Sequence, residues 1–216
     1  MNPYYPLFLN VQTKKCIVIG GGLVALRKVK SLLEHRADIT VISPYHCKGI
    51  DDLFTGGKIR VLRRKYQVGD LEGTLLAVAA TGDKDLNKKI VKEAKKNKVL
   101  LNVVDDPELS DFIVPSVLHR GDISIAVSTG GKSPALAQKI RSRLETHIAD
   151  EYSALALLVN DVRTELKQKG IKFSGSAWQD ALDLDSMVEL LRKGDKAGAR
   201  SILLSRLNKS KLKNKD

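Results

Sequence analysis

The chain has 216 residues, a formal net charge of +12 and an ordinary globular composition, with 43% hydrophobic and 29% charged residues. This length can bury a sizeable core, and the composition excludes a chain that is disordered throughout. The positive charge indicates a polyanionic partner. Only 5% of the residues are aromatic, and no stretch interleaves them with basic residues, so a polycarboxylate is favoured over nucleic acid.

Cysteine usage and the lack of long apolar runs bear on the location of the protein. Cys16 and Cys47 are too few for a disulfide framework, which indicates a reducing compartment. The first residues lack the pattern of a signal peptide, and no later segment approaches the roughly 20 apolar residues of a membrane span. We therefore expect a cytoplasmic protein without a membrane partner. His46 and Cys47 lack the spacing of a structural zinc site, so no protein-bound metal is expected.

A short apolar strand is predicted over residues 16–19, and a helix is predicted from about Leu23 to His35. The three glycines between them give a G-x-G-x-x-A pattern, in which Gly20 allows a sharp turn and Gly22 lets a phosphate approach the backbone. The start of the helix then offers N–H groups and a positive dipole end to a pyrophosphate. The alternative is a strand–helix turn without a nucleotide. The predicted cofactor contacts here are Gly20, Gly21, Gly22, Leu23 and Val24.

Four further strands are predicted, each following a helix or a turn, over residues 38–43, 58–62, 75–80 and 99–104. Strands that alternate with helices indicate an α/β fold with a doubly wound parallel sheet of the Rossmann type. In such a sheet, ligands bind beyond the carboxyl ends of the strands. The residues expected to share that crevice are Gly22, Ser43, Thr81 and Asp105.

The end of the second strand bears on the choice of cofactor. Many NAD proteins carry an acidic residue there for the ribose hydroxyls, whereas this chain has Ser43. The residue pattern alone therefore leaves NAD and NADP open. We expect Ser43, Pro44 and Tyr45 to border the adenosine end of the cofactor and Thr81 to lie near its middle.

The pattern changes after Pro107. Strands are predicted over residues 112–115 and 122–128, with His119 and Arg120 in the loop between them. A second glycine-rich loop, residues 129–134, leads into another helix. From about residue 150 only helices are predicted, over residues 152–167, 176–193 and 196–207, followed by a basic tail that we expect to be frayed.

Four motifs occur in order along roughly residues 7–150: GGGLVALRK at residues 20–28, AATGD at 79–83, NVVD at 102–105 and VSTGGKSP at 127–134. In these motifs and their order the chain resembles the siroheme synthase family, specifically its precorrin-2 dehydrogenase and sirohydrochlorin ferrochelatase module.

This resemblance implies an NAD-dependent oxidation of precorrin-2 to sirohydrochlorin, in some members followed by insertion of ferrous iron. It implies a homodimer formed through the middle region, and it places the family's catalytic aspartate at Asp105. The expected domains are an NAD-binding Rossmann domain over residues 1–113, a small α+β region for dimerisation and substrate binding over 114–149, and a helical domain with a basic tail over 150–216.

Precorrin-2 carries eight carboxylates, which suits a basic protein. Asp105 could accept the proton that the oxidation releases, although it could equally be a turn residue, and Asp106 is an adjacent competitor. The second glycine-rich loop is either an anion cradle or a plain loop, and His119 and Arg120 either grip carboxylates or lie in solvent. The expected substrate contacts are His119, Arg120, Ser128, Thr129, Gly130, Gly131 and Ser133.

Three other functions stay open from the residues. The enzyme could also insert iron, because chelation by a carboxylate leaves no ligand signature. A regulatory module could bind NAD(H) without catalysis, and such a module needs neither Asp105 nor the second glycine-rich loop. A nucleic-acid binder would use the basic tail, and its binding would depend strongly on salt.

Overall fold

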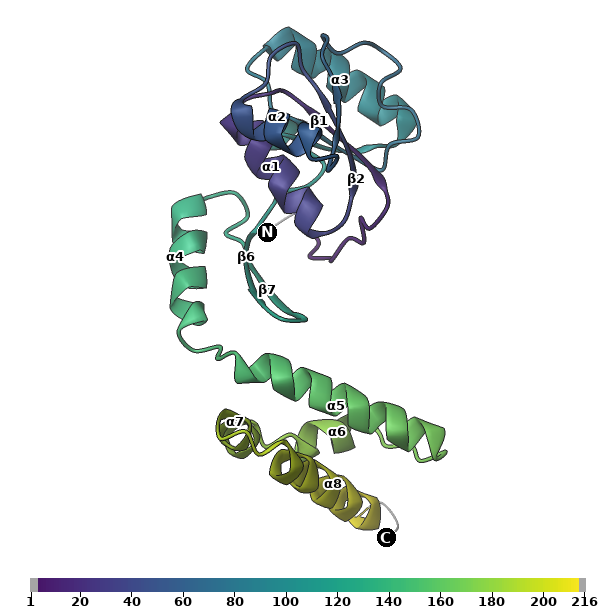
Figure 1. Cartoon of the computed structure of the whole chain (residues 1–216), viewed down its shortest axis with the longest axis vertical. Helices are drawn as coiled ribbons and strands as arrows, with labels where there is room; N and C mark the ends of the chain where they lie inside the picture. Colours follow the sequence, from purple (N-terminus) through teal and green to yellow (C-terminus); the bar gives the residue numbers. More distant parts are fainter. Residues whose placement is uncertain (1–3, 214–216) are drawn as a thin grey trace. The chain divides into compact units, whose positions relative to one another are not determined.

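The computed structural model describes residues 4–213, with side chains described as far as Lys209. The chain divides into two compact units, one up to Val114 and one from Pro115 (Figure 1). The first unit contains β1 (Lys15–Ile19), α1 (Leu23–Glu34), β2 (Asp38–Ile42), α2 (Lys48–Thr55), β3 (Arg60–Leu62), β4 (Leu76–Ala79), α3 (Lys84–Asn97), β5 (Leu100–Val103) and the short 3-10 helix η1 (Pro107–Leu109). The second contains β6 (Ser116–Arg120), β7 (Ile123–Val127), α4 (Pro134–Glu145), α5 (Glu151–Gln168), α6 (Gly175–Ala181), α7 (Leu184–Arg192) and α8 (Lys196–Lys213).

The first unit is a parallel five-stranded sheet in the order β3-β2-β1-β4-β5. The strand order reverses between β1 and β4, which is the switch point at which open α/β sheets bind ligands. The predicted α/β fold with a Rossmann-type sheet is therefore confirmed. Only the strand ends differ, by one or two residues, and the edge strand β3 begins at Arg60 rather than at Lys58.

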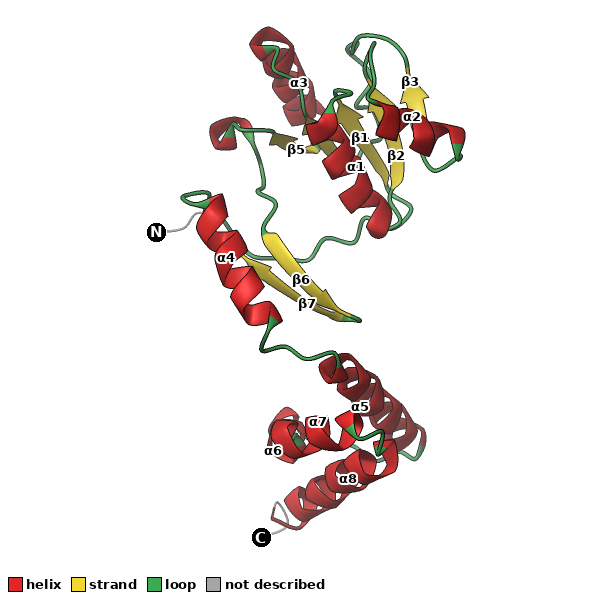
Figure 2. Cartoon of the chain, turned by 60° about the vertical axis from the view of Figure 1, so that its left-hand side comes forward, coloured by secondary structure: helices red, strands yellow, loops and turns green. Residues whose placement is uncertain are grey.

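Helices cover both faces of this sheet. Cys16 and Val18 of β1 pack with α1 and α2 in one buried cluster, whereas Ile17 and Ile19 pack with α3 in another. Side chains that alternate along a strand point to opposite faces, so a strand buried on both sides has an apolar side chain at every position. Figure 2 shows α1 and α3 on either side of the strands.

The second unit begins with an antiparallel hairpin of β6 and β7, against which α4 packs. Helices α5 to α8 follow and enclose a separate apolar cluster that includes Leu158, Met187 and Leu203. The predicted order of a small α+β region followed by helices is confirmed. Within the described residues, no helix is long and apolar enough to cross a membrane.

Three predicted elements are wrong in the second half of the chain. The strand predicted over residues 112–115 is not formed, and a strand instead runs through His119 and Arg120, which were expected in a loop. Proline has no N–H for a sheet ladder, so the strand starts only after Pro115. The helix predicted over residues 176–193 is interrupted, because the Asp183 carboxylate accepts the N–H of Ser186 and starts α7 there.

The C-terminal helix is longer than predicted. It was expected to end at Leu207, but α8 continues to Lys213, so most of the predicted frayed tail is helical. Residues 214–216 lie outside the described part of the chain.

Candidate functional site

The turn from β1 to α1 brings three backbone segments into close contact. Gly20 has φ +126°, and a Cβ added there would lie 2.2 Å from the carbonyl oxygen of Ala80. A Cβ on Gly21 would lie 1.8 Å from the carbonyl oxygen of Tyr45. The Gly21 carbonyl also accepts the N–H of Cys47, at 2.8 Å. Glycine is therefore required at both positions by packing within the protein.

Gly22 differs from its two neighbours. A Cβ on this residue would meet no atom within 4 Å, so it faces open space at the start of α1. The helix has no side-chain cap and no acidic residue in its first turn, and Leu23 beside it is 72% exposed. The first N–H groups of an α-helix lack partners within the helix, and the dipole favours an anion there. The turn therefore fits the pyrophosphate of a dinucleotide.

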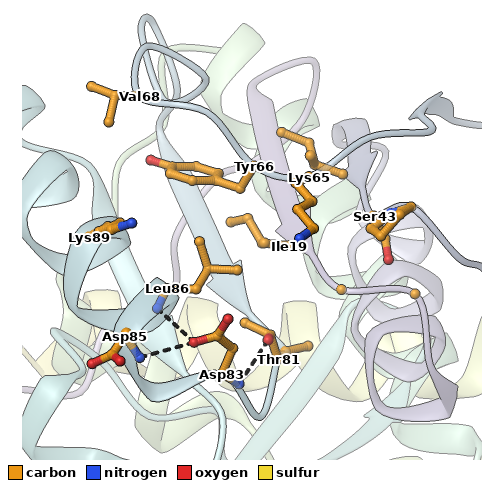
Figure 3. A pocket seen from close by; sticks show the side chains of 15 residues that line it. Ile19, Ser43, Lys65, Tyr66, Val68, Thr81, Asp83, Asp85, Leu86 and Lys89 are labelled. Carbon is orange, nitrogen blue, oxygen red and sulfur yellow. Dashed lines mark hydrogen bonds between the residues drawn. The ribbon is translucent and has the colours of Figure 1, made fainter.

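A cavity of about 630 Å³ opens beside this turn, at the carboxyl ends of β1, β2 and β4 (Figure 3). Its volume is in the range of roughly 300–1,000 Å³ that small-molecule sites occupy. It brings together five of the residues predicted for the cofactor, namely Gly20, Gly21, Ser43, Pro44 and Thr81. Its other lining residues are Ile19, Ile42, Lys65, Tyr66, Val68, Ala80, Asp83, Asp85, Leu86 and Lys89.

The Ser43–Tyr45 segment closes the β2 side of this cavity. The Ser43 hydroxyl donates to the carbonyl oxygen of Tyr45 at 2.8 Å, which fixes the turn after β2. Ser43 and Pro44 line the cavity, whereas the side chain of Tyr45 is 84% exposed and does not. A contact between Tyr45 and the cofactor stays a prediction.

The turn from β4 to α3 closes another side. The Thr81 hydroxyl oxygen accepts the N–H of Asp83 at 3.1 Å. The Asp83 carboxylate in turn accepts the N–H groups of Asp85 and Leu86, at 3.1 and 3.0 Å, and so caps α3 (Figure 3). The predicted residue Thr81 is therefore held in place by the same short network that starts the helix.

The loop between β3 and β4 supplies residues that the sequence analysis did not find. Lys65, Tyr66 and Val68 line the cavity from this loop, and Figure 3 shows the Tyr66 ring on the side opposite Thr81. Burial and the carboxylate of Glu93 raise the pKa of the Tyr66 hydroxyl. The segment has no hydrophobic periodicity and no known motif, so no local signal marks it.

Asp105 follows β5 at the same edge of the sheet. It has a left-handed backbone, with φ +63°, and an exposed side chain. Aspartate adopts this conformation more readily than most residues with a side chain, and Thr13, Arg36 and Lys98 also adopt it, so the backbone alone does not identify a functional residue. Asp106 has a structural role, because its carboxylate accepts the N–H of Leu109 and caps η1. The two adjacent aspartates are thus distinguished by this capping hydrogen bond of Asp106.

Lys28 of α1 lies within electrostatic reach of Asp105. Burial and then Arg27 lower the pKa of the Lys28 ammonium, and the charge of Asp105 opposes this decrease. A half-buried ammonium beside a carboxylate at a sheet edge is an arrangement often found at functional sites. Lys28 belongs to the first motif, GGGLVALRK, but its spacing alone gave it no role.

The second glycine-rich loop is held by its own hydrogen bonds. The Thr129 hydroxyl accepts the N–H of Ser133 at 2.9 Å and donates to its carbonyl oxygen at 3.0 Å. Ser128 accepts the N–H of Gly130, and the Ser133 hydroxyl caps α4. Gly130 and Gly131 have φ of +64° and +82°, which glycine adopts without strain. The hydroxyls expected to bind substrate therefore also shape the loop.

His119 and Arg120 lie on β6, and their surroundings differ. The His119 ring is exposed and has its Nδ1 2.9 Å from the Ser124 hydroxyl. The Arg120 guanidinium is mostly covered, forms an ion pair with Asp150 at 2.9 Å and donates to the carbonyl oxygen of Ile148. Arg120 thus connects the hairpin to the start of α5, and a contact with substrate stays a prediction for both residues.

No group of three or more His, Cys, Asp or Glu side chains within residues 4–213 is placed to hold a metal ion. His46 has both ring nitrogens buried without a hydrogen-bond partner among the described residues. Burial and then Arg63 lower the pKa of its imidazole, and Asp51 opposes this shift.

Comparisons with known proteins agree with this geometry. A family described as putative NAD(P)-binding matches residues 7–116, and one described as sirohaem biosynthesis protein, central, matches residues 120–147. The siroheme synthase of Thioalkalivibrio sulfidiphilus is 38% identical over 202 residues, which are 93% of this chain and 41% of that protein. The siroheme synthase of Nitrosococcus oceani is 36% identical over 202 residues, 93% of this chain and 43% of that protein. The chain thus spans about two fifths of the length of these relatives.

A solved structure is similar over nearly the whole chain. SirC, a precorrin-2 dehydrogenase, has a TM-score of 0.68 and 26% sequence identity, and the match covers 95% of this chain and 100% of that one.

Proposed function

The chain belongs to the siroheme synthase family, with an NAD(P)-binding region over residues 7–116, and on this premise we propose that it oxidises precorrin-2 to sirohydrochlorin with NAD. The observation that carries this proposal is the placement of Asp105. Asp105 follows the carboxyl end of β5, at the same edge of the sheet as the cavity, although it is not among the residues that line the cavity. The solved relative SirC, named a precorrin-2 dehydrogenase, supports the same activity.

In this proposal, different residues of the first unit bind the cofactor and transfer the proton. The start of α1 at Gly22, Leu23 and Val24 binds the pyrophosphate, and the cavity holds the adenosine half of the cofactor. Bound NAD supplies the acceptor for the hydride that leaves a ring carbon of the substrate. Asp105 accepts the proton that leaves with it, and the Lys28 ammonium adds a positive charge on the same side of the sheet.

Substrate binding falls to basic and hydrogen-bonding groups. The net charge of +12 favours a substrate with eight carboxylates. The second glycine-rich loop, from Ser128 to Ser133, offers the exposed ammonium of Lys132 and a fixed backbone, and His119 offers an exposed imidazole. In this proposal Arg120 acts mainly by holding β6 to the following segment.

The chain acts as a homodimer in this proposal. The α4 helix exposes Leu136 and Ile140, which are 52% and 40% exposed and lie one turn apart on the same face. A second copy of the chain would cover this apolar face. We also propose a cytoplasmic location, since Cys16 and Cys47 are both free and the reaction uses NAD.

An anaerobic assay with precorrin-2 and NAD tests the activity, with the tetrapyrrole spectrum as readout. Sirohydrochlorin is expected only when NAD is present. Asp105→Asn is the sharpest variant, because asparagine tolerates the left-handed backbone and removes only the charge. We expect it to lose about 10²–10⁴-fold in turnover, as for a general base, and to bind NAD as before. Asp105→Ala should behave in the same way.

Asp106→Asn is the matched control, because its amide oxygen can still cap η1. Turnover by Asp105→Asn at the rate of the unaltered protein would remove Asp105 from the mechanism. If NAD binds and no precorrin-2 is oxidised, the result favours a regulatory module that binds NAD(H) without catalysis. Ferrous ion added after the oxidation would show whether the chain also accelerates metal insertion over the protein-free rate.

A further inference from the structure

Glu93 of α3 is a buried carboxylate that the proposed reaction does not use. It is 5% exposed, and it lies in the interior between α3 and the loop that joins β3 to β4. Its Oε2 accepts the hydroxyl of Tyr66, and its Oε1 accepts the N–H groups of Gly69 and Leu71 at 3.0 and 2.9 Å. All three donors belong to that single loop.

The loop that Glu93 holds forms one wall of the dinucleotide cavity. Lys65, Tyr66 and Val68 line the cavity, and Figure 3 shows Ile19 and Leu86 between the Tyr66 ring and the Thr81–Asp83 side. This loop follows β3, whose Leu62 carbonyl oxygen accepts the N–H of Ser43 at 3.2 Å, and Ser43 occupies the position where many dinucleotide-binding proteins hold the adenosine ribose. The loop therefore shapes the adenosine half of the cavity.

A second carboxylate closes the same loop on itself. Asp70 forms two hydrogen bonds with the Arg64 guanidinium, at 2.8 and 2.6 Å, and accepts the N–H of Gln67 at 2.8 Å. The Arg64 guanidinium also donates to the carbonyl oxygen of Lys65. This pair fixes the fold of the loop locally, whereas Glu93 fixes the loop to α3.

Burying a carboxylate is costly, and an apolar side chain at a buried ionic position often gives an equally stable protein. The carboxylate of Glu93 does something that an apolar side chain cannot, because it directs three donors of an irregular loop toward one point. A binding-site wall that is already in place spares the ligand the cost of ordering it.

We propose that Glu93 is a positioning residue that holds Tyr66 and the loop from Lys65 to Leu71 in the shape that accepts the adenosine half of the dinucleotide. The inference rests on the proposed cofactor role of the cavity. It does not depend on the identity of the tetrapyrrole.

Calorimetric titration of the full chain with ADP-ribose, which lacks the nicotinamide, tests the proposal directly. Glu93→Ala should raise the Kd for ADP-ribose by about tenfold, because the wall is no longer ordered before binding. Glu93→Gln should stay within about threefold, since an amide oxygen can still accept both N–H groups. Tyr66→Phe keeps the ring and loses the anchor, and it should raise the Kd by about threefold.

Nicotinamide mononucleotide distinguishes this role from a general loss of structure. Its Kd should change less than twofold in the same variants, and kcat for precorrin-2 at saturating NAD should be unchanged while KM for NAD rises. The matched control is Asp38→Asn, which breaks the exposed ion pair with Arg60 at the other end of β2 and should leave both affinities unaltered.

Equal weakening of both half-ligands, or unaltered ADP-ribose binding in Glu93→Ala, would overturn the proposal. If Glu93→Ala does not fold, Tyr66→Phe decides, because wild-type affinity for ADP-ribose in that variant also overturns it. If the ADP-ribose affinities change as predicted but the native chain does not oxidise precorrin-2, the proposed activity fails and the positioning role stands.

Discussion

Gly22 is the position at which a side chain is expected to affect the ligand and leave the fold intact. A Cβ there meets no protein atom within 4 Å, and the backbone is extended, with φ −85°. Gly22→Ala should therefore change the free energy of unfolding by less than about 0.5 kcal/mol. The added methyl group would occupy the space that the pyrophosphate needs, so the Kd for NAD should rise by about tenfold or more. Urea unfolding and calorimetric titration measure the two effects.

Gly20 provides the opposite case two residues earlier. A Cβ there would lie 2.2 Å from the Ala80 carbonyl oxygen, and the backbone is in the left-handed region at φ +126°. Gly20→Ala should lower the free energy of unfolding by about 1–3 kcal/mol or more, through strain and displacement of β4. Stability loss in Gly22→Ala equal to that in Gly20→Ala would show that Gly22 serves the fold and would contradict the assignment.

Asp70, in the loop from Lys65 to Leu71, makes the stability of the folded chain depend on pH. Burial alone would raise the pKa of its carboxyl group, but the hydrogen bonds from Arg64 and Gln67 outweigh burial and hold the pKa below its usual value. A carboxyl group with a lower pKa in the folded state stabilises the fold when it is charged. This stabilisation is present above about pH 4, the ordinary aspartate value, and is lost as the pH falls through the folded pKa.

The expected outcome is a difference between the native chain and Asp70→Asn that depends on pH. At pH 7 the variant should be less stable by about 1 kcal/mol, an amount reduced by the partial exposure of Arg64. Below about pH 4 the difference should shrink, and it should disappear once the pH falls below the folded pKa, because the native carboxylate is then protonated. Urea unfolding at pH 7 and pH 3 measures this, and a difference that is equal at both pH values would contradict the argument.

At the scale of elements, prediction succeeded where the signal is local. Three glycines after an apolar strand identify the turn from β1 to α1, and an alternation of strands and helices identifies the parallel sheet. The hairpin was misplaced although it carries a local signal. The paired residues Arg120 and Ile123 are separated by only two residues, Gly121 and Asp122. A two-residue turn that contains glycine is typical of antiparallel hairpins.

The candidate site was predicted only in part for a physical reason. Ser43 and Thr81 were found because the carboxyl ends of parallel strands meet at one edge. The wall formed by Lys65, Tyr66 and Val68 depends on Glu93, which is 27 residues from Tyr66. Such a contact follows from the packing of α3 on the sheet and leaves no periodic trace in the sequence. The preference for Asp105 over Asp106 came from the family resemblance, and the structure adds that the Asp106 carboxylate caps η1.

The two units of the molecule have separate apolar cores. The buried clusters of the first unit lie within residues 11–112, and the cluster of α5 to α8 lies within residues 152–207. Within the second unit, the hairpin and α4 have little core of their own, since Leu118 and Ala137 are the buried apolar residues of β6, β7 and α4 within the described chain. A small element with so little burial is stabilised by contact with another surface.

This shortage of burial is the reason to expect a dimer through α4. Leu136→Glu with Ile140→Glu places two charges on the exposed apolar face, and the desolvation of these charges should prevent association. Light scattering coupled to size exclusion should give a dimer for the native chain and a monomer for the double variant. Leu157→Glu, on the similarly exposed face of α5, is the control and should stay dimeric. A native chain that is monomeric at all concentrations would refute the proposed dimer, and a dimer in the double variant would place the contact elsewhere.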